Sequence, residues 1–117
     1  MVIKYEEQRR LISYVIDGKI TTANMNQLQM VRDQIPLEHS FRVLAIAKSF
    51  DGYESFDAMR EALRGDLRML SRLSKYVLCT DIRWLRATVT IVNHFLPKNK
   101  LKAFPLHDRK SAEEWLE

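Results

Sequence analysis

The chain has 117 residues, of which 46% are hydrophobic and 29% are charged, and it carries a net charge of +4. This length predicts one domain over residues 1–117, and this composition excludes an intrinsically disordered chain. The single cysteine, Cys79, excludes an internal disulfide. The N-terminus lacks the apolar segment of a signal peptide, and the apolar runs are shorter than the roughly 20 residues of a membrane span. We therefore expect a cytoplasmic protein without a membrane span.

Two strands are predicted at the start of the chain. Residues 2–7 alternate well enough for an opening strand. Residues 11–20 are rich in β-branched and aromatic side chains and predict a second strand that stops at Asp17-Gly18. Residues 8–10 suit a hairpin turn between the two strands, although they lack the Asn-Gly signature.

A helix is predicted next, over residues 21–35. Thr21 or Thr22 can cap its N-terminus by accepting a hydrogen bond from a free backbone N–H, and Pro36 ends it. Four apolar residues recur at helical spacing on one face, namely Met25, Leu28, Val31 and Ile35.

The middle of the chain predicts a buried strand and a long helix. Residues 41–50 form a nearly continuous apolar run, which fits a strand that helices cover on both faces. Residues 55–73 form the longest helix candidate, and Gly65 within it favours close packing. The core stripe of this helix would be Phe56, Met59, Leu63, Leu67 and Leu70.

The last third of the chain predicts two more strands and two helices. Residues 88–92 are β-branched enough for a strand, but apolar residues recur at helical intervals over residues 81–96, and Asp81 is a good cap. We interpret residues 81–96 as a helix. The remaining predicted elements are strands over residues 75–80 and 100–104 and a helix over residues 109–117.

The element order is therefore ββαβαβαβα. Strands that alternate with helices predict a mainly parallel sheet with helices on its faces and right-handed crossovers. The first strand pairs antiparallel at one edge. We expect an α/β sandwich with a mixed, mainly parallel five-stranded sheet.

Four segments in this order resemble the SpoIIAA-like family of small bacterial proteins, which is related in fold to STAS domains and to the Sec14/CRAL-TRIO fold. They are "VIDGKIT" at residues 15–21, "SFDGYESFDAM" at 49–59, "YVLCTDIRWL" at 76–85 and "KAFPLHDRKSAEEWL" at 102–116. The resemblance implies a small α/β sandwich, a homodimer, no established catalytic residues, and an apolar or lipid-like ligand.

One motif of related proteins is missing. Anti-sigma-factor antagonists of this fold carry Asp-Ser-[Ser/Ala]-Gly where the third strand meets the second helix. Here residues 50–55 read Phe-Asp-Gly-Tyr-Glu-Ser, so Ser55 is present but the phosphorylation motif is not. We therefore do not expect a phosphoserine switch.

The candidate site lies in the loops after the third and fourth strands. Ligands of open α/β sheets bind outside the carboxyl ends of the strands, and both loops leave that edge. A structural interpretation explains much of the first loop, because Gly52 allows a turn and Ser55 caps a helix. If the loops instead line a largely apolar cleft, the ligand-binding residues are Phe50, Asp51, Tyr53, Phe56, Asp81 and Trp84.

Positive charge gathers in the second half of the chain. Residues 58–117 hold twelve Lys/Arg and seven Asp/Glu, which raises the expectation of an anionic partner slightly. Two basic clusters stand out, Arg60, Arg64, Arg68 and Arg72 along the long helix and Lys98, Lys100 and Lys102 near the last strand. We interpret the arginines as a solvated flank, with a ridge for phosphates as the alternative. Nucleic acid is not an expected partner because no recognised binding signature occurs.

The sequence leaves three functions open. The first is a non-enzymatic module that binds a small apolar or lipid-like ligand between the two loops. The second is a STAS-like regulatory domain that binds a protein partner around Ser55 and the second helix. An enzyme is the least favoured, since catalytic and metal-binding motifs do not occur, and we expect neither cofactor nor metal.

Overall fold

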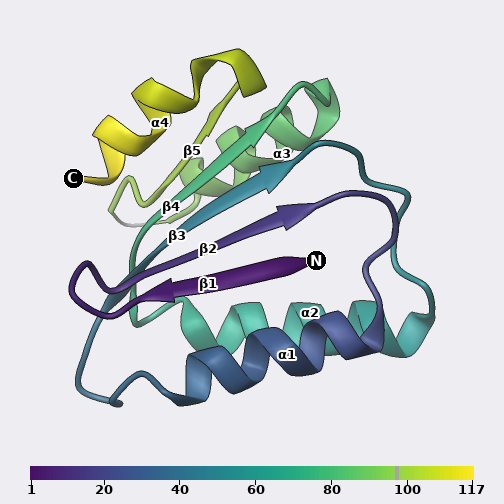
Figure 1. Cartoon of the computed structure of the whole chain (residues 1–117). Coiled ribbons are helices and arrows are strands. Elements are labelled where there is room, and N and C mark those ends of the chain that lie inside the picture. The colour runs from purple at the N-terminus through teal and green to yellow at the C-terminus, as the bar shows by residue number, and fades with distance from the viewer. Residues whose placement is uncertain (97) are drawn as a thin grey trace.

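The computed structural model describes the backbone of residues 1–96 and 98–117, and the side chains in these ranges except those of Phe56, Glu61, Leu63 and Leu67. At its centre is a five-stranded sheet in the order β1-β2-β3-β4-β5 (Figure 1). The strands are β1 (Val2–Glu6), β2 (Leu11–Ile16), β3 (Phe41–Ala47), β4 (Leu73–Thr80) and β5 (Leu101–Phe104). The helices are α1 (Thr22–Asp33), α2 (Phe56–Met69), α3 (Arg83–His94) and α4 (Arg109–Leu116), with a short 3-10 turn, η1 (Leu106–Asp108).

The sheet is mixed and mainly parallel. β1 pairs antiparallel with β2, whereas the pairs β2–β3, β3–β4 and β4–β5 are all parallel. The central strands β3 and β4 are buried on both faces over residues 43–47 and 77–80, which explains their unbroken apolar sequence. The predicted fold class is thereby confirmed.

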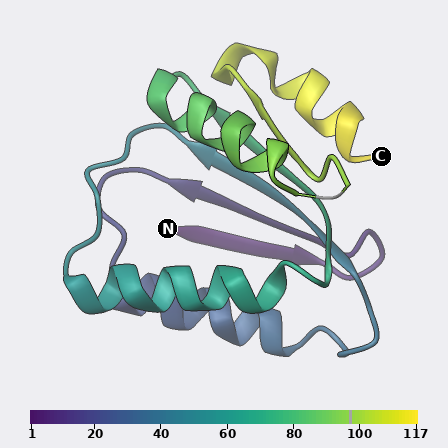
Figure 2. The ribbon, with the colours of Figure 1, turned by 180° about the vertical axis from the view of Figure 1, so that it is seen from behind.

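Helices cover the two faces of the sheet unequally. The crossover helices α1, α2 and α3 lie on one face, and α4 lies on the other (Figures 1 and 2). Right-handed crossovers between neighbouring parallel strands place their helices on the same face, which accounts for this arrangement. On the α4 face, Leu44 and Ile46 of β3 pack with Ala112 and Leu116 of α4.

The N-terminal hairpin forms as predicted, and its second strand ends next to Asp17. Arg10 turns the chain with φ of 49°, and its N–H donates to the carbonyl of Glu7. The predicted stop of the second strand at Asp17-Gly18 is confirmed. β2 ends at Ile16 because Gly18 adopts φ of 94° and donates its N–H to Ser49 Oγ.

α1 begins with a complete capping box. Thr21 accepts from the backbone N–H of Asn24, and the Asn24 side chain accepts from the backbone N–H of Thr21. The predicted core stripe is confirmed, since Leu28 and Ile35 are buried and Met25 and Val31 pack against the same cluster.

α2 is capped by Ser55, which accepts from the N–H of Ala58 at 3.1 Å. The prediction that this helix continues to Leu73 is wrong, because Leu73 already pairs with Phe41 as the first residue of β4. Of the predicted core stripe, Met59 and Leu70 are half-buried. The side chains of Phe56, Leu63 and Leu67 lie outside the described residues.

Residues 83–94 are helical, so the helix interpretation of this segment is confirmed. The prediction that Asp81 caps it is wrong. The N-cap of α3 is Ile82, which makes no side-chain capping bond, and Asp81 Oδ1 instead accepts from the N–H of Leu106 at 3.0 Å. Asp81 therefore fixes the start of η1 rather than the start of α3.

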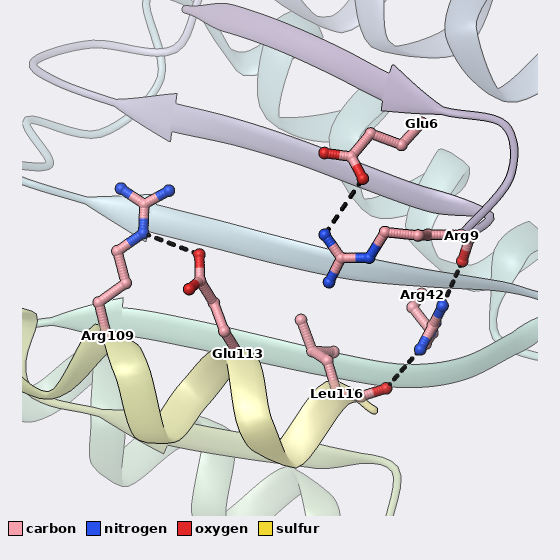
Figure 3. A network of polar contacts seen from close by, with 6 residues as sticks. All are labelled: Glu6, Arg9, Arg42, Arg109, Glu113 and Leu116. Carbon is pink, nitrogen blue, oxygen red and sulfur yellow. Dashed lines mark hydrogen bonds and ion pairs between the residues drawn. The ribbon is translucent and has the colours of Figure 1, made fainter.

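The C-terminal helix is held by two cations of the sheet. Arg42 of β3 donates to the carbonyl of Leu116 at 2.7 Å and also to the carbonyl of Arg9 in the β1–β2 turn (Figure 3). Lys75 of β4 donates to the carbonyls of Trp115 and Glu117. These bonds satisfy carbonyl groups that a helix C-terminus leaves without partners.

Candidate functional site

A cavity of about 150 Å³ lies on the three-helix face of the sheet. Its walls come from β2, β3 and β4, from α1, α2 and α3, and from the loop after β3. The lining residues are Met1, Tyr14, Ile16, Ile20, Met25, Leu28, Ala47, Phe50, Tyr53, Ala62, Asp66, Tyr76, Leu78 and Leu85. Aliphatic and aromatic side chains therefore form most of the wall.

Small side chains make room for the cavity. Ala47 at the end of β3 and Ala62 on α2 both line it, and both are buried. A larger side chain at either position would occupy part of the space that these alanines leave open. The volume thus depends on two alanines, one on the sheet and one on the helix layer.

Two tyrosine hydroxyls give the cavity its polar wall. Tyr14 of β2 and Tyr76 of β4 project from the same face of the sheet, and their hydroxyl oxygens lie 3.4 Å apart. Burial, with a smaller contribution from the Asp66 carboxylate, raises the pKa of Tyr14 to about 12. Burial and then the neighbouring Tyr14 raise the pKa of Tyr76 well above its usual value. Both groups are neutral near pH 7, and each can donate or accept a hydrogen bond.

An ion pair borders the cavity on the helix side. Asp66 of α2 lines the cavity and accepts from Arg32 of α1 at 2.9 Å. The Arg32 side chain is only 10% exposed, whereas 64% of the Asp66 side chain is exposed. The surrounding protein raises the pKa of the Asp66 carboxyl by desolvation, and the Arg32 guanidinium opposes this rise. Asp66 therefore stands at the edge of the cavity toward solvent.

Gly65 allows this ion pair to form. A Cβ atom at Gly65 would lie 2.6 Å from Arg32 Nη1, closer than two such atoms can approach. The absence of a side chain lets the Arg32 guanidinium pass beside α2 to Asp66. The close packing that the sequence predicted at Gly65 is therefore the passage of a buried arginine.

The loop after β3 brings three of the predicted ligand-binding residues together. The rings of Phe50 and Tyr53 meet edge to face with centroids 5.7 Å apart, and both residues line the cavity. The ring of Trp84, on α3, lies 5.9 Å from that of Phe50. Trp84 is largely exposed and stands beside the lining rather than in it.

The other predicted residues lie elsewhere. Asp51 is exposed, and its backbone N–H donates to the carbonyl of Gly18. Asp81 binds the backbone of η1, and neither aspartate lines the cavity. The side chain of Phe56 lies outside the described residues.

The polar groups of the cavity were not predicted from the sequence. Tyr14 and Tyr76 sit inside strands, where a tyrosine is an ordinary strand former. Asp66 is one charge among many on α2, and its position in the helix does not distinguish it. A signal exists for the tyrosines, because each is a large residue with a polar tip directly before an apolar strand segment, residues 15–16 and 77–79.

The arginine series of α2 divides into separate roles. Arg60 pairs with Asp57 at 2.7 Å, one helical turn away. Arg72 lies after α2, which ends at Met69, and it donates to the carbonyls of Ile35 and Pro36, so it ties the turn before β4 to the segment after α1. Arg64 and Arg68 line a small cleft between α1 and α2. Arg72 is therefore a structural residue rather than part of a ridge.

Two features of the described residues bear on function. Among the side chains that the structure describes, no three of His, Cys, Asp or Glu gather as a metal site would require. Over residues 1–96 and 98–117, every helix falls short of the length and apolar character that crossing a bilayer takes. Tyr14, Tyr53, Tyr76 and Asp66 are the lining residues whose side chains carry polar groups.

Comparison with known proteins agrees with this architecture. The family model described as SpoIIAA-like matches residues 11–117. The chain belongs to the SpoIIAA-like family. A search of curated proteins found no match for this SpoIIAA-like chain. A similar solved structure is that of an uncharacterized protein of the DUF3478 family, with a SpoIIAA-like fold, from Shewanella loihica PV-4. It has a TM-score of 0.78 at 18% identity, and the match covers 98% of this chain and 90% of the other.

Proposed function

We propose that this protein is a non-enzymatic binding module for a small apolar molecule that carries one hydrogen-bonding group. The cavity on the three-helix face supports this proposal more than any other feature. Its wall is mostly apolar and its polar groups converge from two strands, which is how small-molecule sites are usually built. The hydroxyls of Tyr14 and Tyr76 would bind the polar group of the ligand.

The volume limits the size of the ligand. An apolar cavity of about 150 Å³ holds a molecule the size of benzene. A ring or short branched chain with a hydroxyl, carbonyl or carboxyl group fits this limit. For a lipid-like ligand, the cavity would enclose only a segment of the ligand's acyl chain.

Native mass spectrometry of freshly purified protein, followed by organic extraction, tests the proposal. We expect a reproducible added mass that extracts as a small apolar molecule. The Ala62→Leu variant should lose this mass and stay folded, because leucine fills the cavity and favours a helix. Met30→Leu on the outer surface of α1 is the matched control and should retain the ligand.

Two aromatic variants test the wall of the site. Tyr53→Ala and Trp84→Ala should each reduce retention of the bound molecule in a protein that remains folded. Full retention in both folded variants, together with retention in Ala62→Leu, would refute the assignment of the cavity as the binding site.

A STAS-like regulatory domain remains the second candidate, as the exposed apolar residues of α3 would suit a partner surface. Ser55 favours it less, because its hydroxyl already caps α2. If the purified protein carries no added mass, the regulatory-domain candidate becomes the favoured function. A pull-down would then search for its protein partner. Light scattering on the same sample tests the homodimer that the family resemblance implies. We also propose that the protein is located in the cytoplasm.

A further inference from the structure

α3 and its C-cap residue carry an exposed apolar strip, which we define as Trp84, Ile91 and Phe95. These side chains are 57%, 60% and 84% exposed. At about 100° per residue, the three positions fall within about 40° of one another around the helix axis. Exposed apolar residues are normally scattered singly, so an aligned set that includes two aromatic rings indicates a contact surface.

All the acidic and basic side chains in the segment that contains this strip, apart from its histidines, are Lys or Arg. Residues 82–107 contain five Lys/Arg and no Asp/Glu, although the whole chain has 15 acidic residues. Arg83 and Lys98 are exposed near the two ends of α3. A partner for this surface therefore needs an apolar region for the strip and, next to it, negative charges for the Lys and Arg side chains.

We propose that α3 docks this protein on the surface of a bilayer that contains anionic lipids. The strip would enter the boundary between headgroups and acyl chains, and the cations would meet the lipid phosphates. Amphipathic helices that lie in the membrane plane have this pattern of aromatic residues beside Lys and Arg. This inference goes beyond the ligand-binding proposal and does not depend on it.

A second copy of the chain suits the strip less well. Two copies that meet through α3 would bring their cationic flanks together, and like charges that face each other oppose association. A standard interface also takes about 20–30 residues on each side, far more than this strip provides. Shallow insertion into lipid needs only a few apolar side chains.

The position of the strip adds a functional link. The Trp84 ring contacts Phe50, and Phe50 lines the cavity. The docked face would therefore place the cavity beside the membrane. An apolar ligand could then pass between the bilayer and the cavity without crossing bulk water.

Flotation with lipid vesicles tests the docking surface. We expect the full chain to bind vesicles of equal parts phosphatidylcholine and phosphatidylglycerol, to bind pure phosphatidylcholine weakly, and to dissociate as salt is added. The double variant Ile91→Ser/Phe95→Ser should lower binding about tenfold or more, because it removes most of the inserted apolar area. Met30→Ser, whose side chain is 66% exposed on α1, is the control and should bind as the parent does.

A charge variant tests the same surface without changing the apolar strip, so any effect of the serine substitutions on folding does not enter the result. Arg83→Gln/Lys98→Gln should weaken binding to the anionic vesicles and reduce its dependence on salt. The inference is overturned if the parent does not bind anionic vesicles or if the Ile91→Ser/Phe95→Ser variant binds equally well. It is also overturned if light scattering shows a dimer that this variant converts to monomers while vesicle binding is absent.

Discussion

Two tyrosine hydroxyls, those of Tyr14 and Tyr76, face each other at the cavity wall. In the folded chain they stay neutral to high pH because burial opposes the charged phenolate. In the unfolded chain the same groups ionise near pH 10, the ordinary value for tyrosine. Their titration is therefore linked to unfolding.

This linkage predicts a loss of stability in alkali. Between about pH 10 and pH 12 the unfolded chain has released the Tyr14 proton and the folded chain has kept it, so rising pH favours unfolding. Urea unfolding measured across this range should show the free energy of unfolding falling, and Tyr14→Phe should make the fall shallower. An identical slope for Tyr14→Phe and the parent would contradict the assignment.

At the level of residues, the sequence predicted aromatic members of the candidate site better than polar ones. Phe50 and Tyr53 follow a strand end, and position alone placed them at the cavity. Asp51 and Asp81 follow the same edge, but Asp51 is exposed and Asp81 accepts from the backbone N–H of Leu106. Local sequence does not distinguish an aspartate that fixes a loop from one that faces a ligand, because both satisfy the same hydrogen-bonding need.

The two long helices α1 and α2 are joined through Gly65, where Arg32 passes to Asp66. An exposed helical glycine replaced by alanine normally gains about 1 kcal/mol from helix propensity. Here the new methyl group would displace the Arg32 guanidinium from its partner. The two effects oppose each other, so the sign of the substitution depends on Arg32.

A double-mutant cycle measures this dependence. We expect Gly65→Ala to destabilise the parent, and to stabilise an Arg32→Met background by about 1 kcal/mol, since no guanidinium then blocks the methyl group. Thermal or urea unfolding of the four proteins gives the coupling energy. Equal effects of Gly65→Ala in both backgrounds would show that Arg32 and Gly65 are not coupled.

Helices were predicted more accurately than their ends. The sequence predicted Ser55 as one cap and Thr21 or Thr22 as the other, because a hydroxyl before an apolar run has one common use, and the structure shows Ser55 and Thr21. The end of α2 was missed because Leu73 fits a helical stripe as well as it fits a strand. That choice is made by pairing with Phe41, a contact between residues far apart in the chain.

Across the whole molecule, Arg42 connects three distant segments. It extends from β3 to the carbonyls of Arg9, in the first turn, and Leu116, at the end of α4 (Figure 3). The order of strands was predictable because alternation with helices restricts the topology. This connection was not, because a single arginine in an apolar strand gives no indication of which carbonyl groups it will meet.

Arg42→Met should destabilise the fold by about 2 kcal/mol, because charged hydrogen bonds to two carbonyls are lost. Hydrogen exchange should also quicken in α4 before the sheet is affected. Arg109→Met is the matched control, since its ion pair with Glu113 is exposed and should contribute less than about 1 kcal/mol. Equal destabilisation by the two variants would contradict the role of Arg42.

The cavity also determines how the protein responds to hydrostatic pressure. Unfolding eliminates internal space, and the volume decrease on unfolding scales with the part of that space that the folded chain leaves unfilled. Compression therefore favours the unfolded chain over a folded chain with an empty cavity. A ligand that fills the space removes this volume difference, so it raises the pressure at which the chain unfolds.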